Sequence, residues 1–160
     1  MKTVIFACVH NAGRSQMAAG FFNKLRQLQT PNSKLQRSTR AISAGTSPAA
    51  RVHPEVVEVM KEVGIDLSAA KPQKLTPELA QTADLLVTMG CGDQCPYVPG
   101  LRVEDWPLED PKGKPIERVR EIRDEIKVRV ESLLQEMNDA RGNRSTTEPQ
   151  RPTEIKKNSS

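Results

Sequence analysis

Residues 2–7, with the sequence KTVIFA, form a continuous run of apolar and β-branched residues, followed directly by a polar stretch that contains glycine. A strand exposed on one face alternates polar and apolar residues, whereas a continuous apolar run is typical of a strand buried on both faces. Sheets of that kind are parallel and carry helices on each side. The run therefore indicates an α/β fold.

The rest of the chain alternates between short strand patterns and longer helical ones. A helix is predicted to begin near Arg14, because apolar residues recur there at helical spacing: Met17, Phe21, Leu25 and Leu28. Further strands are predicted at 41–45, which ends at a glycine turn, at 84–89, and more weakly at an edge at 101–106. Further helices are predicted at 53–64, at 76–83 and from Pro115 to about Met137. This alternation is the pattern of an α/β domain.

Two polar stretches do not fit a packed domain. Residues 29–40 are polar, rich in turn formers and basic, and we expect them to form an exposed basic excursion. Residues 138–160 contain almost no apolar side chains, and we expect a disordered polar tail. The predicted catalytic domain is therefore residues 1–137.

The composition limits the classes of function. A chain of 160 residues can bury a core without disulfides, so its three cysteines, Cys8, Cys91 and Cys95, need another explanation. The opening MKTVIFA is too short an apolar stretch for a secretion signal, so we expect a cytoplasmic protein with reduced thiols. No apolar run is long enough to span a membrane. The net charge of +4 comes with only 3% aromatic residues, which favours small anions over nucleic acid.

The segment CVHNAGRS, residues 8–15, lies between the first predicted strand and the first predicted helix. A turn at this place points successive backbone N–H groups at one spot, and the positive end of the helix dipole adds to them, which suits a tetrahedral oxyanion. Arg14 can grip two oxygens of such an anion through its planar guanidinium. The same field stabilises Cys8 as a thiolate, and the Ser15 hydroxyl can donate a hydrogen bond to the sulfur.

The segment therefore places a nucleophile beneath a phosphate-like anion. The alternative is a core cysteine at a strand end beside an unrelated surface arginine, since a cysteine and an arginine six positions apart are a weak signal by themselves. The strand before Cys8 and the helix from Arg14 favour the functional interpretation.

Several segments, in the same order, resemble the low-molecular-weight tyrosine phosphatase family and, within it, the arsenate reductases: CVHNAGRSQMA, AISAGT, HPEVVEVMKEVGIDLS, DLLVTMGCGDQCP and DWPLEDP. The resemblance runs from Lys2 to about Met137. It implies a four-stranded parallel sheet flanked by helices on both faces. It also implies an oxyanion-binding loop made of Val9, His10, Asn11, Ala12, Gly13, Arg14 and Ser15.

The resemblance further implies that Cys8 is the nucleophile, Arg14 the anion clamp and Asp110 the general acid. An aspartic acid there would protonate the departing oxygen of the anion. Without the resemblance, Asp110 could equally be a turn residue before Pro111.

A phosphatase and an arsenate reductase share the first half of their reactions, because arsenate copies the charge and shape of phosphate. A phosphatase then hydrolyses the cysteine adduct with water, whereas reduction of As(V) takes two electrons from sulfur. Attack of a second thiolate on Cys8 expels arsenite and leaves a disulfide. In thioredoxin-linked members of the family, the resemblance implies that Cys91 attacks Cys8 and that Cys95 then forms a disulfide that a reductant reaches.

The spacing of Cys91 and Cys95 leaves the reductant open. Only Gln94 separates Asp93 from Cys95, whereas thioredoxin-linked members usually space their cysteines farther apart. The form GCGDQCP resembles a branch in which glutathione or mycothiol forms the adduct and a glutaredoxin-like protein resolves it, so that only Cys8 is needed. Cys91 could then be a buried structural thiol and Cys95 a simple loop closure. We expect no bound cofactor and an external reductant: thioredoxin, or the small thiol with a glutaredoxin-like protein.

We predict no metal site. The two neighbouring cysteines lack a second ligand pair for zinc, since His10 and His53 are the only histidines. Ala19 stands where potassium-binding members of the family carry glutamate. The sequence after the predicted acid, DPKG, also lacks the tyrosines of the related phosphatases, and Tyr97 is the only tyrosine of the chain. This absence counts against an aromatic phosphoester as substrate.

The sequence therefore predicts an arsenate reductase of arsenic detoxification, with arsenate as substrate and phosphate or sulfate as analogues. We expect a monomer that binds no nucleic acid and no membrane. One alternative is a low-molecular-weight phosphotyrosine phosphatase, because Cys8, Arg14 and Asp110 suffice for that activity, and a weak form of it could persist beside the reductase. A second alternative is a non-catalytic oxyanion-binding or redox-sensing protein.

Overall fold

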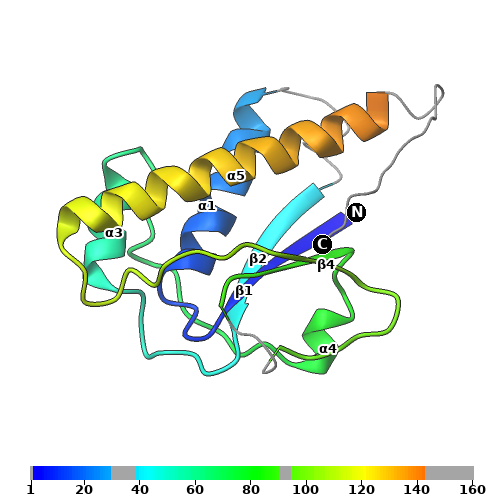
Figure 1. Cartoon of the computed structure of the whole chain (residues 1–160), viewed down its shortest axis with the longest axis horizontal. Helices are drawn as coiled ribbons and strands as arrows, with labels where there is room; N and C mark the ends of the chain where they lie inside the picture. Colours follow the sequence, from blue (N-terminus) through cyan, green and yellow to red (C-terminus); the bar gives the residue numbers. More distant parts are fainter. Residues whose placement is uncertain (1, 30–38, 91–94, 143–160) are drawn as a thin grey trace.

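The structure is a computed structural model, which describes residues 2–29, 39–90 and 95–142. Its elements, in chain order, are β1 (Lys2–Cys8), α1 (Arg14–Gln29), β2 (Thr39–Gly45), α3 (Pro54–Lys61), α4 (Pro77–Ala80), β3 (Leu85–Thr88), β4 (Arg102–Asp105) and α5 (Ile116–Gly142). The four strands pair in parallel in the order β2-β1-β3-β4 (Figure 1). The predicted α/β fold with a four-stranded parallel sheet is confirmed, as is the edge position of its fourth strand.

Helices cover both faces of this sheet. Alternate side chains of the central strand β1 enter two separate cores: Val4 and Phe6 pack with α1, α3 and α5, whereas Ile5 and Ala7 pack with residues around α4. Figure 1 shows α5 lying across α1 on one side of the sheet and α4 on the other. Because side chains alternate along a strand, only a strand between two such layers needs a continuous apolar run.

The first helix begins at Arg14, as predicted. Met17 and Phe21 are buried and Leu25 is partly buried, but Leu28 is 65% exposed. The prediction that Leu28 continues the buried face is therefore wrong, and this face ends at Leu25.

The second strand starts earlier than its sequence pattern indicates. β2 begins at Thr39, which pairs with Lys2 at the start of β1 and is fully buried. Residues 39 and 40 thus belong to the sheet and not to the predicted basic excursion, because hydrogen bonding to β1 extends β2 to the same length whatever the polarity of its residues. Residues 30–38 of the excursion lie outside the described residues.

The last helix runs farther than predicted. α5 continues from Met137 to Gly142, so residues 138–142 are helical rather than part of a disordered tail. Each residue added to an existing helix gains a hydrogen bond, so the extension needs no apolar side chain. Residues 143–160 lie outside the described residues. Neither α5 nor any other helix in the described ranges is long and apolar enough to cross a membrane.

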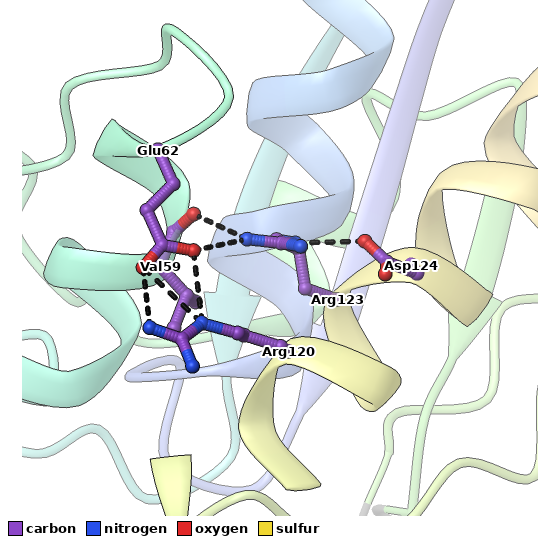
Figure 2. Close-up of polar contacts among 5 residues, drawn as sticks. All are labelled: Val59, Glu62, Arg120, Arg123 and Asp124. Atoms are coloured by element: carbon purple, nitrogen blue, oxygen red, sulfur yellow. Dashed lines mark hydrogen bonds and ion pairs between the residues drawn. The ribbon is translucent and has the colours of Figure 1, made fainter. Parts of the chain in front are cut away.

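A cluster of ion pairs joins α3 to α5 (Figure 2). Glu62, at the end of α3, lies 2.8 Å from a guanidinium nitrogen of Arg120 and 2.7 Å from one of Arg123. Arg123 also donates a hydrogen bond to the carbonyl oxygen of Val59 at 2.9 Å and pairs with Asp124. Hydrogen bonds from Arg120 and Arg123 hold the pKa of Glu62 below its usual value. The cluster is therefore ionised at neutral pH and fixes α5 against α3.

Candidate active site

The loop between β1 and α1 turns its carbonyl oxygens away from its centre. Four of them accept hydrogen bonds from backbone N–H groups elsewhere, at 2.8–3.2 Å: Cys8 from Thr46, Val9 from Ser47, His10 from Ala49 and Ala12 from His53. Within the described parts of the chain, no N–H of residues 9–13 donates a hydrogen bond. Because the C=O and N–H of one peptide unit point in opposite directions, these N–H groups face the inside of the loop, at the start of α1. An oxyanion site needs this arrangement.

Cys8 begins this loop as a free and buried thiol. Its Sγ lies 3.0 Å from Oγ of Ser15, and that Oγ accepts a hydrogen bond from the Asn11 side-chain amide at 2.7 Å. Since the hydroxyl already accepts from Asn11, its own proton is available to the sulfur. The Ser15 hydroxyl is therefore placed to donate to Cys8.

Asn11 is held in an uncommon conformation. It is the only non-glycine residue with a positive φ, 52°, in the described parts of the chain. Its Oδ1 accepts hydrogen bonds from the backbone N–H of Gln73 at 2.9 Å and from Nε2 of Gln16 at 3.2 Å. These two donors decide which end of the amide faces Ser15, namely the NH₂ group. Sequence reasoning missed both residues, and Gln73 had no local signal, because it lies 62 residues from Asn11 along the chain.

Gly45 supports the loop from the end of β2. A Cβ at this position would lie 2.6 Å from the carbonyl oxygen of Val9 and 2.9 Å from Cβ of Asn11, so only glycine lets the loop pack there. The sequence predicted that the strand ends at this glycine, and β2 does end there. The structure adds that Gly45 pairs with Cys8 and that its lack of a side chain makes room for the loop.

Arg14 is 8% exposed and is held from two sides. Its Nη1 donates a hydrogen bond to the carbonyl oxygen of Leu108 at 2.9 Å, in the segment after β4. On the other side lies Gly90, after β3, where an added Cβ would be 2.7 Å from the same Nη1. Gly90 has a φ of +95°, which side chains rarely adopt. The guanidinium is therefore fixed by the ends of two neighbouring strands.

Asp110 lies beside Arg14, with 3.8 Å between its Oδ2 and Nη2 of the guanidinium. Its Oδ1 accepts a hydrogen bond from the backbone N–H of Lys112 at 3.0 Å, which forms a local turn. One oxygen thus stabilises a turn, which was the alternative role for Asp110 in the sequence analysis, while the other oxygen lies toward Arg14. The side chain is 45% exposed, so the carboxyl group can exchange protons with solvent.

The remaining cysteines are placed differently. Cys91 lies outside the described residues. Cys95 is partly buried against the core on the α4 side of the sheet and is disulfide-bonded, whereas Cys8 belongs to the core on the α1 side. Direct exchange between Cys8 and Cys95 would therefore require the segment around Cys95 to move.

Other residues discussed in the sequence analysis occupy structural positions. Nδ1 of His10 lies 3.2 Å from the carbonyl oxygen of Ser47, and His53 precedes α3 as its N-terminal cap residue. The Trp106 ring packs 5.5 Å from that of Phe6, at the end of β4. Within residues 2–29, 39–90 and 95–142, no three His, Cys, Asp or Glu side chains gather as a metal site would need.

The Ser15→Ala variant tests the hydrogen bond to the sulfur. We expect alkylation of Cys8 by iodoacetamide at pH 7 to slow about tenfold, because a hydrogen bond to a charged group is lost. The rate is measured by mass spectrometry of the peptide that contains Cys8. Ser68→Ala, at an exposed position, is the control and should react as wild type does. Equal rates for Ser15→Ala and wild type would show that Ser15 does not stabilise the thiolate.

Known proteins are similar to this chain in sequence. Residues 3–143 match the family described as low molecular weight phosphotyrosine protein phosphatase. A relative from Halobacterium salinarum is 43% identical over 133 residues, which cover 83% of this chain and 91% of the relative. The glutaredoxin arsenate reductase of Synechocystis sp. is 36% identical over 137 residues, which cover 84% of this chain and 97% of that protein.

A solved structure gives the same result. The thioredoxin-dependent arsenate reductase of Corynebacterium glutamicum superposes with a TM-score of 0.70 and 38% identity, over 86% of this chain and 62% of that longer chain. The family match covers nearly all the described residues, and the family predicted from the sequence motifs is confirmed. The chain belongs to the low molecular weight phosphotyrosine protein phosphatase family, in which its relatives include arsenate reductases.

Proposed function

We propose that this protein is an arsenate reductase in which Cys8 attacks an arsenate ion held by the loop of residues 9–15. The observation that carries the proposal is the meeting of a buried thiol, a hydroxyl donor, an arginine and a carboxylic acid at the carboxyl end of the sheet. Open parallel sheets bind ligands at this edge. The relatives named as arsenate reductases support the choice of substrate.

Binding of the anion rests on the backbone of the loop and on Arg14. The inward N–H groups of residues 9–13 and the positive end of α1 attract a tetrahedral dianion. Arg14 uses one N–H for the Leu108 carbonyl oxygen and keeps other N–H groups for the anion. Because the guanidinium is already fixed, little side-chain entropy is lost when arsenate binds.

The first chemical step forms a bond between Cys8 Sγ and arsenic. The thiolate supplies the electron pair, and one arsenate oxygen leaves as water after it is protonated. Asp110 supplies a proton for this departure, since its Oδ2 lies 3.8 Å from Nη2 of Arg14, the guanidinium that binds the anion. Arsenic is still As(V) after this step.

The second step reduces the arsenic. A second thiolate attacks Cys8 Sγ, the S–S bond forms, and the electrons of the broken S–As bond pass to arsenic, which leaves as As(III) in arsenite. We assign this thiolate to Cys91 and the next exchange to Cys95. Gly90, the residue that precedes Cys91 in the chain, lies close to the Arg14 guanidinium. The disulfide-bonded state of Cys95 supports a role for this residue in exchange.

External thiols must return the two electrons, and two donor systems fit: a dithiol such as thioredoxin, or a small thiol with a glutaredoxin-like protein. The Synechocystis relative is named for glutaredoxin and the Corynebacterium structure for thioredoxin. A three-thiol relay within one chain produces a disulfide that thioredoxin can reduce directly. A small thiol with a glutaredoxin-like protein requires only Cys8. The two routes thus differ in their need for Cys91 and Cys95, and both operate in a reducing compartment such as the cytoplasm.

Arsenite formation from arsenate separates the two routes. Wild type, Cys91→Ser and Cys95→Ser are each supplied with a thioredoxin system and, in parallel, with glutathione or mycothiol plus glutaredoxin. We expect activity with thioredoxin that falls at least about 100-fold in both variants, because each lacks one thiol of the relay. Activity only with the small thiol, unchanged in both variants, would reduce the mechanism to Cys8 and overturn the relay.

A phosphotyrosine phosphatase is the second candidate, because the family description and the set of Cys8, Arg14 and Asp110 both fit it. No arsenite with either donor, together with rapid hydrolysis of aryl phosphates, would establish this function in place of the reductase.

A further inference from the structure

The segment between β4 and α5 brings Asp110 to the active site through three contacts. The Leu108 carbonyl oxygen accepts a hydrogen bond from Arg14 at 2.9 Å, and Asp110 lies 3.8 Å from the same guanidinium. Pro111 packs close to Gly13, where an added Cβ would lie 3.0 Å from the proline ring. These contacts hold the segment on the side of the anion loop.

A separate set of contacts holds the other side of this segment, at Glu109. Its Oε1 accepts hydrogen bonds from Nε of Arg118 at 2.8 Å and from Nη2 of the same guanidinium, and its Oε2 pairs with Nζ of Lys114 at 3.0 Å. Arg118 is itself oriented by Glu121, at 2.9 Å. Hydrogen bonds from Arg118 and Lys114 hold the pKa of Glu109 below its usual value, so this carboxylate is ionised at neutral pH.

The adjacent acids Glu109 and Asp110 therefore have opposite surroundings. Glu109 has both oxygens occupied, one by Arg118 of α5 and the other by Lys114 of its own segment. Asp110 keeps one oxygen for the Arg14 side. Arg118 belongs to the first turns of α5, a helix anchored in the core by the fully buried Val119 and Ile122. The ion pair thus ties the segment of the acid to a rigid element.

We propose that Glu109 and Arg118 are positioning residues, and that their ion pair sets the place of Asp110 over the anion. This inference rests on the proposed role of Asp110 as proton donor. Between Asp110 and α5 the backbone makes a turn at Gly113, with a φ of +74° and open space around it, so this side of the segment has little packing of its own. Without the ion pair, Asp110 spends less time within reach of the departing oxygen, and proton transfer is sensitive to such displacement.

The expected signature is a loss in the chemical step without a loss in anion binding. The anion is held by the loop N–H groups and by Arg14, neither of which contacts Glu109 or Arg118 in the described residues. The variants are Glu109→Gln, Arg118→Met and the double variant. The matched control is Arg120→Met, on the same helix, whose guanidinium pairs with Glu62 and not with this segment (Figure 2).

We expect kcat for arsenite formation to fall about two- to fivefold in each single variant, because an exposed ion pair shifts a local equilibrium by roughly that factor. The double variant should lose no more kcat than either single variant, because each single substitution already removes the same ion pair. The inhibition constant of phosphate, a measure of anion binding, should stay within about twofold of wild type, and Arg120→Met should keep wild-type kcat. Circular dichroism confirms that each variant is folded.

The Asp110→Asn background separates positioning from a general structural role. If Glu109 and Arg118 act through Asp110, Arg118→Met should cause no further loss of kcat in that background. Three results would each overturn the inference. They are an equal loss of kcat in both backgrounds, a parallel rise of the inhibition constant of phosphate, and a wild-type kcat in Glu109→Gln. If wild type forms no arsenite, the proposed function is wrong, whatever the variants do. The ion pair is then tested on aryl phosphates, where loss of a positioned acid should slow phenyl phosphate more than p-nitrophenyl phosphate, whose leaving group needs less protonation.

Discussion

Cys8→Ser is expected to lower arsenite formation by at least about 10⁴-fold, because a serine hydroxyl is not ionised at neutral pH and has no electrons to give to arsenic. Binding of arsenate and phosphate should be retained, since the loop N–H groups and Arg14 are untouched. The hydroxyl also fits the place of the thiol beside Ser15. Turnover is measured with both reductant systems, and binding by titration calorimetry with phosphate.

The result distinguishes the enzyme from a non-catalytic binder. If this protein only bound oxyanions, wild type and Cys8→Ser would show the same binding and neither would turn over. Ser68→Ala, at an exposed position, is the control and should keep wild-type turnover and binding. Substantial arsenite formation by Cys8→Ser would show that Cys8 is not the nucleophile.

Arg14→Lys should have the second largest effect, a fall of kcat/KM of about 10²- to 10³-fold. A lysine ammonium has a single nitrogen, so it cannot bind two anion oxygens while it also donates to the Leu108 carbonyl oxygen as Arg14 does. The buried carbonyl would lose its donor, and the segment of Asp110 would lose one of its anchors. Both a higher KM and a lower kcat are therefore expected.

Steady-state assays of arsenite formation check this expectation. Arg102→Lys is the matched control, because Arg102 is an exposed arginine on the edge strand β4, paired with Glu104. It should keep wild-type kinetics. A kcat/KM for Arg14→Lys within threefold of wild type would show that a positive charge suffices and that the planar, two-pronged geometry of arginine is not used.

The sequence predicted the layered fold and the nucleophile loop because both signals are local. The continuous apolar run of β1 is readable without knowledge of its neighbours, and it required helices on both faces. Cys8, Arg14 and Ser15 lie within one turn between a strand and a helix, so their proximity follows from chain connectivity. Errors occurred where backbone hydrogen bonding extended an element whose own residues are polar, at Thr39 in β2 and after Met137 in α5.

The contacts that hold the site residues in place had no local signal in the sequence. Gln73 reaches Asn11 across 62 residues, and the Leu108 carbonyl oxygen meets Arg14 across 94. Gly45 and Gly90 are glycines because another segment occupies the space of a side chain, which no local pattern shows. The sequence by itself thus determined which residues we propose for the chemistry. Only the tertiary structure decided how Asn11 orients Ser15 and how Asp110 reaches Arg14, because those contacts form between distant segments that only the packed sheet and helices bring together.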